Sequence, residues 1–230
     1  MNNEKEFGVP ANLADQFAVR DSGGGAPAAA PATEPKAEPA SPSAIPVTKA
    51  EKVKQEKASA KVLKKEGNKI GKREVPNRWT MTPFFRTGER AIFDITYFGA
   101  TAGQLELEVL PQKVVADRPT YHFRAVATTT SIFSLFYRVN DVAESFMDTE
   151  GLFSHKFSLK LDESKQERDV LELYDQQKRK AYYWSKLIHA QKGRINDQSE
   201  IDLVPFTQDG LSSFFYVRTL PLEIGKTYEF

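Results

Sequence analysis

The stretch Phe153-Ser154-His155-Lys156-Phe157-Ser158-Leu159-Lys160-Leu161 decides the fold class, because apolar side chains stand at almost every second position. Alternation with a period of two places apolar residues on one face of an extended strand and polar residues on the other. An amphipathic helix would need apolar residues spaced three or four positions apart. This stretch therefore predicts a half-buried antiparallel strand.

The same alternation extends in both directions from this stretch. Further strands are predicted at residues 90–98, 104–109, 121–125, 137–148, 167–174, 181–184 and 188–192. Polar turn sequences separate them, as at 162–165 and 175–178. Because no helical segment lies between these strands, the pattern predicts a mainly β fold, a curved antiparallel meander sheet or half-barrel.

One helix is expected near the C-terminus. Residues 207–212 supply capping side chains, and Leu211, Phe214, Phe215 and Arg218 follow at helical spacing. This helix is predicted to pack on the sheet. After it, a turn at Gly225 leads into a further strand that ends with the chain, so we expect a C-terminal truncation that leaves a sheet edge open.

The first third of the chain has a different composition. Residues 1–78 contain only two of the 26 aromatic residues, Phe7 and Phe17, and 14 of the 21 positions in 26–46 are Ala or Pro. Such a segment buries too little apolar surface to offset the entropy of ordering its backbone. The sequence therefore predicts a disordered Pro/Ala-rich and Lys-rich tail or linker over 1–78 and an antiparallel β domain over 79–230.

Residues 49–78 carry 11 Lys or Arg and four Glu. Two interpretations stay open: a basic tether that makes peripheral contact with an anionic membrane or envelope polymer, or a solvated spacer. No aromatic residue stands among the lysines, so the stacking part of a single-strand nucleic-acid site is missing. We expect no nucleic-acid partner.

The whole composition excludes several protein classes. Lys and Arg number 32 and Asp and Glu 31, which gives a formal charge of +1 rather than a polycation or polyanion. Because there is no Cys, disulfides, thiolate metal sites and cysteine nucleophiles are excluded. No stretch reaches the roughly 20 apolar residues that span a bilayer, so no transmembrane segment is expected.

No catalytic constellation emerges from the remaining polar residues. The three histidines, His122, His155 and His189, lack metal-ligand spacing. His155 is either a base in a pocket or a hydrogen-bonded core histidine. The carboxylates Asp141, Glu144 and Asp148 fit acid–base chemistry or the polar face of a strand, with Glu144 and Asp148 on one face. We expect no enzyme, no metal and no cofactor.

Aromatic residues concentrate in the β domain. An aromatic-lined groove on a curved sheet can hold an elongated apolar ligand, whereas the same residues can also form the core beneath the helix. The residues proposed for such a groove are Phe133, Phe136, Tyr137, Phe157, Trp184 and Phe215. Residues 131–137, if they lie at the rim, are expected to dip into a membrane surface or close over the groove.

Several short motifs occur in a fixed order over residues 86–230. They are Gly88-Glu89, Tyr97-Phe98-Gly99 with Ala102-Gly103, the segment 130–137, Asp141, Glu144-Ser145, Asp148 with Gly151-Leu152, Gln208-Asp209-Gly210-Leu211-Ser212-Ser213, the segment 216–222, and Gly225-Lys226. In this order they resemble the bacterial DUF3108 family, a family of unknown function.

The resemblance implies a location and a fold but no reaction. Members look like exported envelope proteins of Gram-negative bacteria built as a curved antiparallel sheet or half-barrel, which implies the periplasm or the outer envelope. They normally begin with a signal peptide or a lipoprotein signal and continue beyond Gly225-Lys226. Met1-Asn2-Asn3-Glu4-Lys5 does not resemble a secretory signal. A fragment or a late start is therefore expected.

Three functional hypotheses follow. The first is a non-catalytic envelope module that binds a lipid or envelope polymer in the aromatic groove. The second is an interaction module that recognises an envelope protein by adding a strand at an open sheet edge. The third, an enzyme, has the least support because no catalytic arrangement was found.

Overall fold

The computed structural model describes residues 4–22, 85–220 and 222–227, which belong to one compact unit. Its strands are β1 Arg20–Asp21, β2 Arg90–Tyr97, β3 Ala100–Val115, β4 Arg118–Thr129, β5 Asn140–Asp148, β6 Ser154–Asp162, β7 Gln166–Asp175, β8 Lys180–His189 and β9 Gly193–Asp202. Its helices are α1 Glu4–Phe7, α2 Ala11–Gln16, α4 Ser131–Ser134, α5 Ser212–Tyr216 and the 3₁₀ helix η1 Val217–Thr219.

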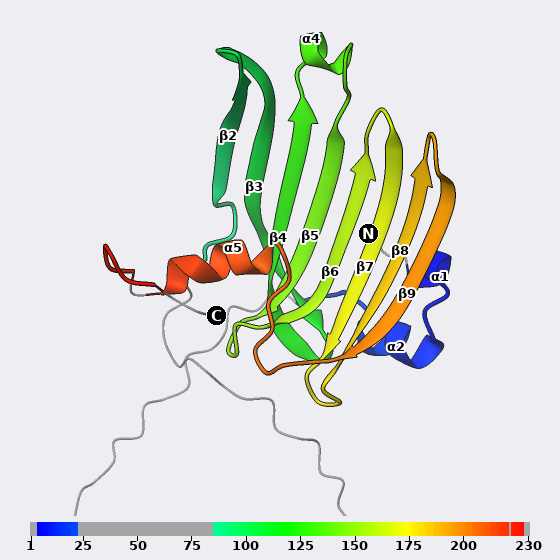
Figure 1. Ribbon diagram of the computed structural model, residues 1–230. Helices are drawn as coiled ribbons and strands as arrows, with labels where there is room; N and C mark the ends of the chain where they lie inside the picture. The colour runs from blue at the N-terminus through cyan, green and yellow to red at the C-terminus, as the bar shows by residue number, and fades with distance from the viewer. Residues whose placement is uncertain (1–3, 23–84, 221, 228–230) are drawn as a thin grey trace, which may run out of the picture. The chain divides into compact units, whose positions relative to one another are not determined.

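All nine strands form one antiparallel sheet (Figure 1). Strands β3 to β9 follow one another across it, each paired with the next along the chain. β2 and β1 pair with opposite ends of β3 along its other side. The sheet stays open, with β2 and β1 along one edge and β9 at the other. The predicted antiparallel meander with one helix near the C-terminus is confirmed, and the sheet does not close into a barrel.

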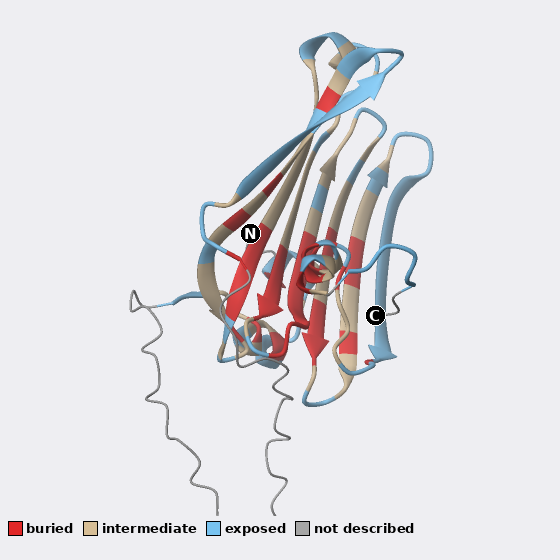
Figure 2. Ribbon diagram, turned by 90° about the vertical axis from the view of Figure 1, so that its left-hand side faces the viewer, coloured by how far each residue is buried: buried red, intermediate tan, exposed pale blue. Residues whose placement is uncertain are grey.

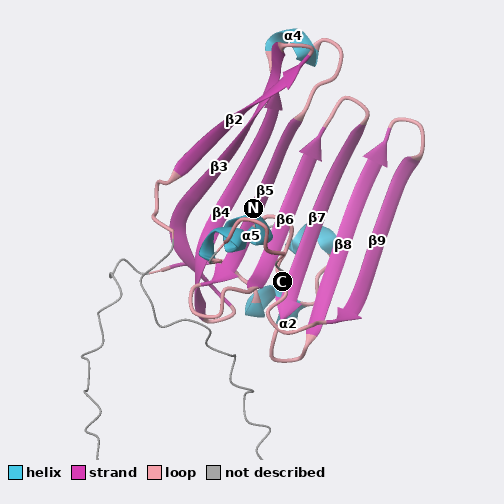
Figure 3. Ribbon diagram, turned by 60° about the vertical axis from the view of Figure 1, so that its left-hand side comes forward, coloured by secondary structure: helices cyan, strands magenta, loops and turns pink. Residues whose placement is uncertain are grey.

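The two faces of the sheet bury two separate apolar clusters. We call the face that packs against α5 the inner face and the face that packs against α1 and α2 the outer face; Figure 3 shows these helices on opposite sides of the strands. Both clusters lie toward the same end of the strands, while the other strand ends are more exposed (Figure 2). Phe123 of β4, which is fully buried, occupies the inner cluster with Phe215 of α5 stacked on it at 3.8 Å between ring centroids.

The predicted tail was wrong for residues 4–22. These residues form α1, α2 and β1 on the sheet, and they bury Leu13 and Phe17 in the outer cluster. This segment has too few apolar residues to form a core by itself, but apolar side chains of the sheet pack against those it has. Residues 23–84, including the Pro/Ala-rich and Lys-rich stretches and the expected boundary at 78/79, lie outside the described residues.

The predicted strand at 188–192 was also wrong. β8 continues through the predicted segment 181–184 to His189, the turn follows, and β9 begins at Gly193. Every residue of β9 is exposed. Because a strand exposed on both faces needs no apolar alternation, its sequence carries no strong strand signal.

Gly103 permits the close approach of β3 to β4. A Cβ atom at this position would lie 2.5 Å from the carbonyl oxygen of Thr128, closer than a carbon and a backbone oxygen can pack. We expect Gly103→Ala to lower the free energy of unfolding by about 1–3 kcal/mol, because the strands must move apart. Urea denaturation measures this loss, and Ala102→Gly is the neighbouring control. A loss no larger than that of the control would contradict the close-approach argument.

Two further predictions concern membrane-spanning segments and a strand at the C-terminus. In the segments 4–22, 85–220 and 222–227, no helix is long and apolar enough to cross a membrane. Around Gly225 the described residues 222–227 contain a turn and no strand. The remainder of the predicted C-terminal strand, residues 228–230, lies outside the described residues.

Candidate binding site on the inner face

A mainly apolar cavity of about 250 Å³ lies on the inner face between α5 and the β2–β3 hairpin. Register places Ala91 opposite Leu107 and Phe93 opposite Leu105, so these side chains share one face of the hairpin. The residues that line the cavity are Glu89, Ala91, Phe93, Leu107, Val109, Phe214, Phe215 and Arg218. We call this space the inner-face cavity.

Asp209 holds α5 at the wall of this cavity. One carboxylate oxygen accepts hydrogen bonds from the backbone N–H groups of Leu211 and Ser212, both at 2.8 Å. The other accepts from the hydroxyl groups of Ser145 on β5 at 2.6 Å and Ser154 on β6 at 2.7 Å. Burial raises the pKa of Asp209, while these hydrogen bonds act to lower it. Asp209 thus joins the start of α5 to two strands.

A pair of opposite charges lines part of the inner-face cavity. The Arg218 guanidinium lies 2.5 Å from a carboxylate oxygen of Glu89, and about half of its side chain is exposed. The same guanidinium lies 5.3 Å from the ring centroid of Phe85 and 6.0 Å from that of Phe215. Cation–π contacts of this kind hold the charged group beside the apolar wall.

The six aromatic residues predicted for one groove lie in three separate places. Phe157 and Phe215 are buried in the inner cluster, whereas Trp184 is buried in the outer cluster. Phe133, Phe136 and Tyr137 lie in and directly after α4, at the far end of the strands (Figure 1). The structure therefore brings Phe215 alone of the six to the lining of the inner-face cavity.

The segment around α4 instead forms an exposed apolar tip. Tyr97, the last residue of β2, and Phe98, in the turn that follows, pack edge to face with ring centroids 4.5 Å apart. Tyr97 also approaches Phe133, at 6.4 Å between ring centroids. Leu135 and Phe136 are each 83% exposed. We call Tyr97, Phe98, Ile132, Leu135 and Phe136 the apolar tip. The expectation that this segment dips into a membrane stays a prediction.

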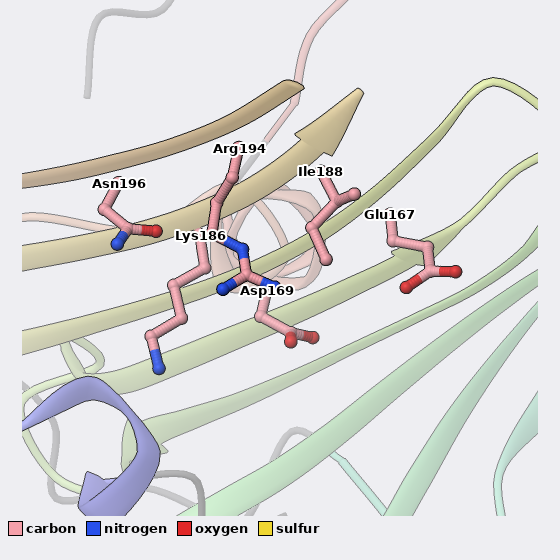
Figure 4. Close-up of a pocket in the computed structure, with 6 residues that line it drawn as sticks. All are labelled: Glu167, Asp169, Lys186, Ile188, Arg194 and Asn196. Carbon is pink, nitrogen blue, oxygen red and sulfur yellow. The ribbon is translucent and has the colours of Figure 1, made fainter. Parts of the chain in front are cut away.

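A second cavity, of about 290 Å³, lies on the outer face across β7, β8 and β9. Its lining side chains are Glu167, Asp169, Lys186, Ile188, Arg194 and Asn196 (Figure 4). Two acidic and two basic side chains leave it without a net charge, so it favours neither anions nor cations. Lys186 is also engaged elsewhere, since it donates a hydrogen bond to the backbone of Glu6. The inner-face cavity is the better candidate site.

Asp148 forms the centre of a buried ionic cluster at the end of β5. Its carboxylate accepts hydrogen bonds from the Arg118 guanidinium, from His155 Nε2 at 3.0 Å and from the backbone N–H of Gly151 at 2.6 Å. Burial alone would raise the pKa of Asp148, but the hydrogen bonds from Arg118 and His155 outweigh it and hold that pKa well below its usual range. His155 is thus a hydrogen-bonded core histidine.

No metal centre is formed in the part of the chain that the structure describes, where no group of three or more His, Asp or Glu side chains is arranged to hold an ion. The sequence also missed most of the cavity lining. Alternation in 90–98 predicted that Phe93, Ile95 and Tyr97 share one face of a strand, and the register confirms that Phe93 and Ile95 share the face of Leu105. It could not show that this side would face the helix that carries Phe214.

Comparison with known proteins gives one match. A family model described as "Protein of unknown function (DUF3108)" matches residues 92–230, more than half of the chain. The matched range includes β3 to β9, α5 and nearly all of β2, but not residues 4–22. Neither the curated proteins nor the solved structures yielded a match.

Proposed function

This chain belongs to the DUF3108 family, and we propose that it is a non-catalytic binding module of the Gram-negative cell envelope, periplasmic or associated with the outer envelope. In this proposal the inner face of the sheet holds an elongated apolar ligand such as a lipid acyl chain. The inner-face cavity is the observation that carries the proposal. Its apolar walls favour a hydrocarbon over a polar metabolite.

The size of the cavity limits what it can enclose. Clefts and cavities that bind small molecules measure roughly 300–1,000 Å³, whereas the inner-face cavity measures about 250 Å³. It would therefore hold one part of a long ligand. The rest would continue along the inner face, where the partly buried side chains of Leu105, Ala125 and Ala143 border the core.

The charges at the cavity suggest how an amphipathic ligand would be oriented. Arg218 presents an exposed guanidinium at the apolar wall, paired with Glu89. A carboxylate or phosphate head group would compete with Glu89 for that guanidinium, because Arg binds both anions in a bidentate manner. The apolar tip offers a second surface suited to a membrane, since its exposed aromatic and aliphatic side chains resemble those of interfacial anchors.

A fluorescent fatty acid, dansyl-undecanoic acid, tests the inner-face cavity. We expect Phe93→Asp to weaken binding of this probe by about 10–100-fold, because a carboxylate against the acyl chain loses hydration without gaining a partner. Ile92→Asp is the matched control: Ile92 is similarly exposed on the same strand, but its side chain points to the outer face. We expect that control to change the affinity by less than about threefold. Equal losses in both variants, or no binding by the unmodified chain, would contradict the proposal.

Strand addition is the second candidate function, and β2 favours it. All eight residues of β2 are exposed, and Ile92, Phe93, Ile95 and Tyr97 make it an apolar edge. Long exposed apolar edges pair readily with another chain. β9 suits this role less well, because charged residues such as Arg194 and Asp197 occupy that edge. If strand addition at β2 is the function, we expect the purified chain to carry no lipid.

A further inference from the structure

Residues 4–22 contact the outer face as a peptide ligand contacts its receptor. The connection between Ser22 and Phe85 contains 62 residues, all outside the described ranges, and the family match does not include the segment. We propose that residues 4–22 are a docking peptide that binds the outer face through its own contacts, so that the segment of one copy can occupy the outer face of a second copy.

Apolar anchors supply the first part of this contact. Phe17 is fully buried and Leu13 is 5% exposed, although the segment is too short to bury either one by itself. They pack into the outer cluster, which the sheet provides through Val115, Phe146, Leu171, Leu173 and Trp184. Large buried anchors in a pocket are the usual source of affinity in a peptide interface.

A buried ion pair supplies the second part. Glu4 of α1 forms a salt bridge with Lys156 of β6, and both side chains are nearly inaccessible to solvent. In the absence of Glu4, a carboxylate from elsewhere or water must satisfy the Lys156 ammonium. The ion pair between Glu4 and Lys156 therefore favours the binding of a segment in which an acidic residue precedes the apolar anchors.

Further contacts follow the segment to its end. Gln16 donates a hydrogen bond to Asp175 at 3.1 Å, and Arg20 lies 2.7 Å from Asp117. At the end of the segment, Asp21 pairs with Lys113 at 2.5 Å. Arg20 and Asp21 also form β1, which extends the sheet by pairing with β3. This is strand addition at a short stretch of edge, a recurring mode of peptide recognition.

The length of the connection decides whether exchange between copies is feasible. Tethers give effective concentrations on the order of millimolar when short, and less as they lengthen. With a connection of 62 residues, the outer face therefore binds the segment of its own chain in preference to that of another copy at micromolar protein concentration. This preference is finite, so another copy can replace the segment at a higher concentration. A free copy of the segment must compete with it.

The test uses the full chain with a specific protease site inserted after Ala40, together with a fluorescein-labelled peptide of residues 1–22. After cleavage, we expect the N-terminal fragment to co-elute with the domain in gel filtration and the labelled peptide to exchange into the complex. Exchange into uncleaved chains should need at least about tenfold more peptide, because the tethered segment competes. Equal binding to cleaved and uncleaved chains would place the peptide elsewhere and overturn the proposal, as would separation of the fragment during gel filtration.

A matched pair of peptides tests the contact itself. Leu13→Asp should weaken peptide binding by at least about 100-fold, because it removes a buried anchor and buries a carboxylate. Asn12→Asp adds the same charge at the exposed neighbouring position and should change binding by less than about threefold. Equal affinities of the two variants would show that Leu13 does not dock on the outer cluster and would overturn the proposal.

Discussion

Replacing Asp209 with alanine is expected to lower the free energy of unfolding by about 3–5 kcal/mol, because four buried donors lose their acceptor. Two of these donors are the backbone N–H groups of Leu211 and Ser212 at the start of α5, and two are the hydroxyl groups of Ser145 and Ser154 on the sheet. Without the Asp209 carboxylate, α5 loses the connection that this side chain makes to Ser145 of β5, and the contact between the hydroxyl groups of Ser212 and Ser154, at 2.7 Å, still joins it to β6. The wall of the inner-face cavity should therefore loosen as well.

Urea denaturation of the Asp209 variants measures this effect. Ser213→Ala, in the same helix, is the control, because it removes only a hydroxyl that contacts the backbone of Gly210. It should lower the free energy of unfolding by about 0.5 kcal/mol or less. Asp209→Asn should lower the free energy of unfolding by less than Asp209→Ala does, because the amide keeps one acceptor oxygen and the serine hydroxyls can turn to accept from its NH₂ group. A loss below about 1 kcal/mol for Asp209→Ala would contradict the role given to this residue.

Replacing Asp148 with asparagine is expected to lower the free energy of unfolding by about 3–5 kcal/mol at neutral pH, because it leaves the partly buried Arg118 without its principal counter-charge. Glu150→Gln is the matched control. Glu150 also pairs with Arg118, at 3.1 Å, but half of its side chain is exposed, so its loss should cost less than about 1 kcal/mol. Equal losses for both variants would contradict the view that burial of Asp148 makes the pair important.

The pH dependence of the same variant has a defined sign. The pKa of Asp148 is lowered in the folded state, so the unfolded chain binds a proton first as the pH falls. The stability that Asp148 contributes is therefore fully present above about pH 5 and declines as the pH falls below its unfolded pKa of about 3.9 toward the lower folded value. The difference between the unmodified chain and Asp148→Asn should shrink over this range. A difference that grows on acidification would contradict the direction of the shift.

Local sequence patterns predicted those parts of the fold that depend on one element at a time. The alternation around Phe157 predicts that this residue lies on the apolar face of its strand, and the spacing of Leu211 and Phe215 predicts the helix whose Phe215 shares a cluster with it. The N-terminal segment escaped prediction because most of the cluster that buries Phe17 comes from the sheet, more than ninety positions further along the chain. The composition of the segment gives no information about contacts with strands so far along the chain.

The candidate site required the pairing of strands as well as the pattern of each strand. Phe157 lies opposite Glu172, and Glu172 lies opposite Tyr183, so these three residues share the inner face. Trp184, one position further, must then point to the outer face. Alternation defines two faces for each strand separately, but only the register shows which of those faces belong together. For this reason the six predicted aromatics divided among three places.

Native mass spectrometry of the full chain, purified without detergent from a Gram-negative host, tests the central claim most directly. The account predicts a bound mass of a few hundred daltons that disappears in organic solvent, is lost in Phe93→Asp and is retained in Ile92→Asp. A ligand-free mass for the unmodified chain, both as purified and after addition of a fatty acid, would contradict the claim that the inner face binds an apolar ligand. It would then favour the exposed edge of β2 as the functional surface.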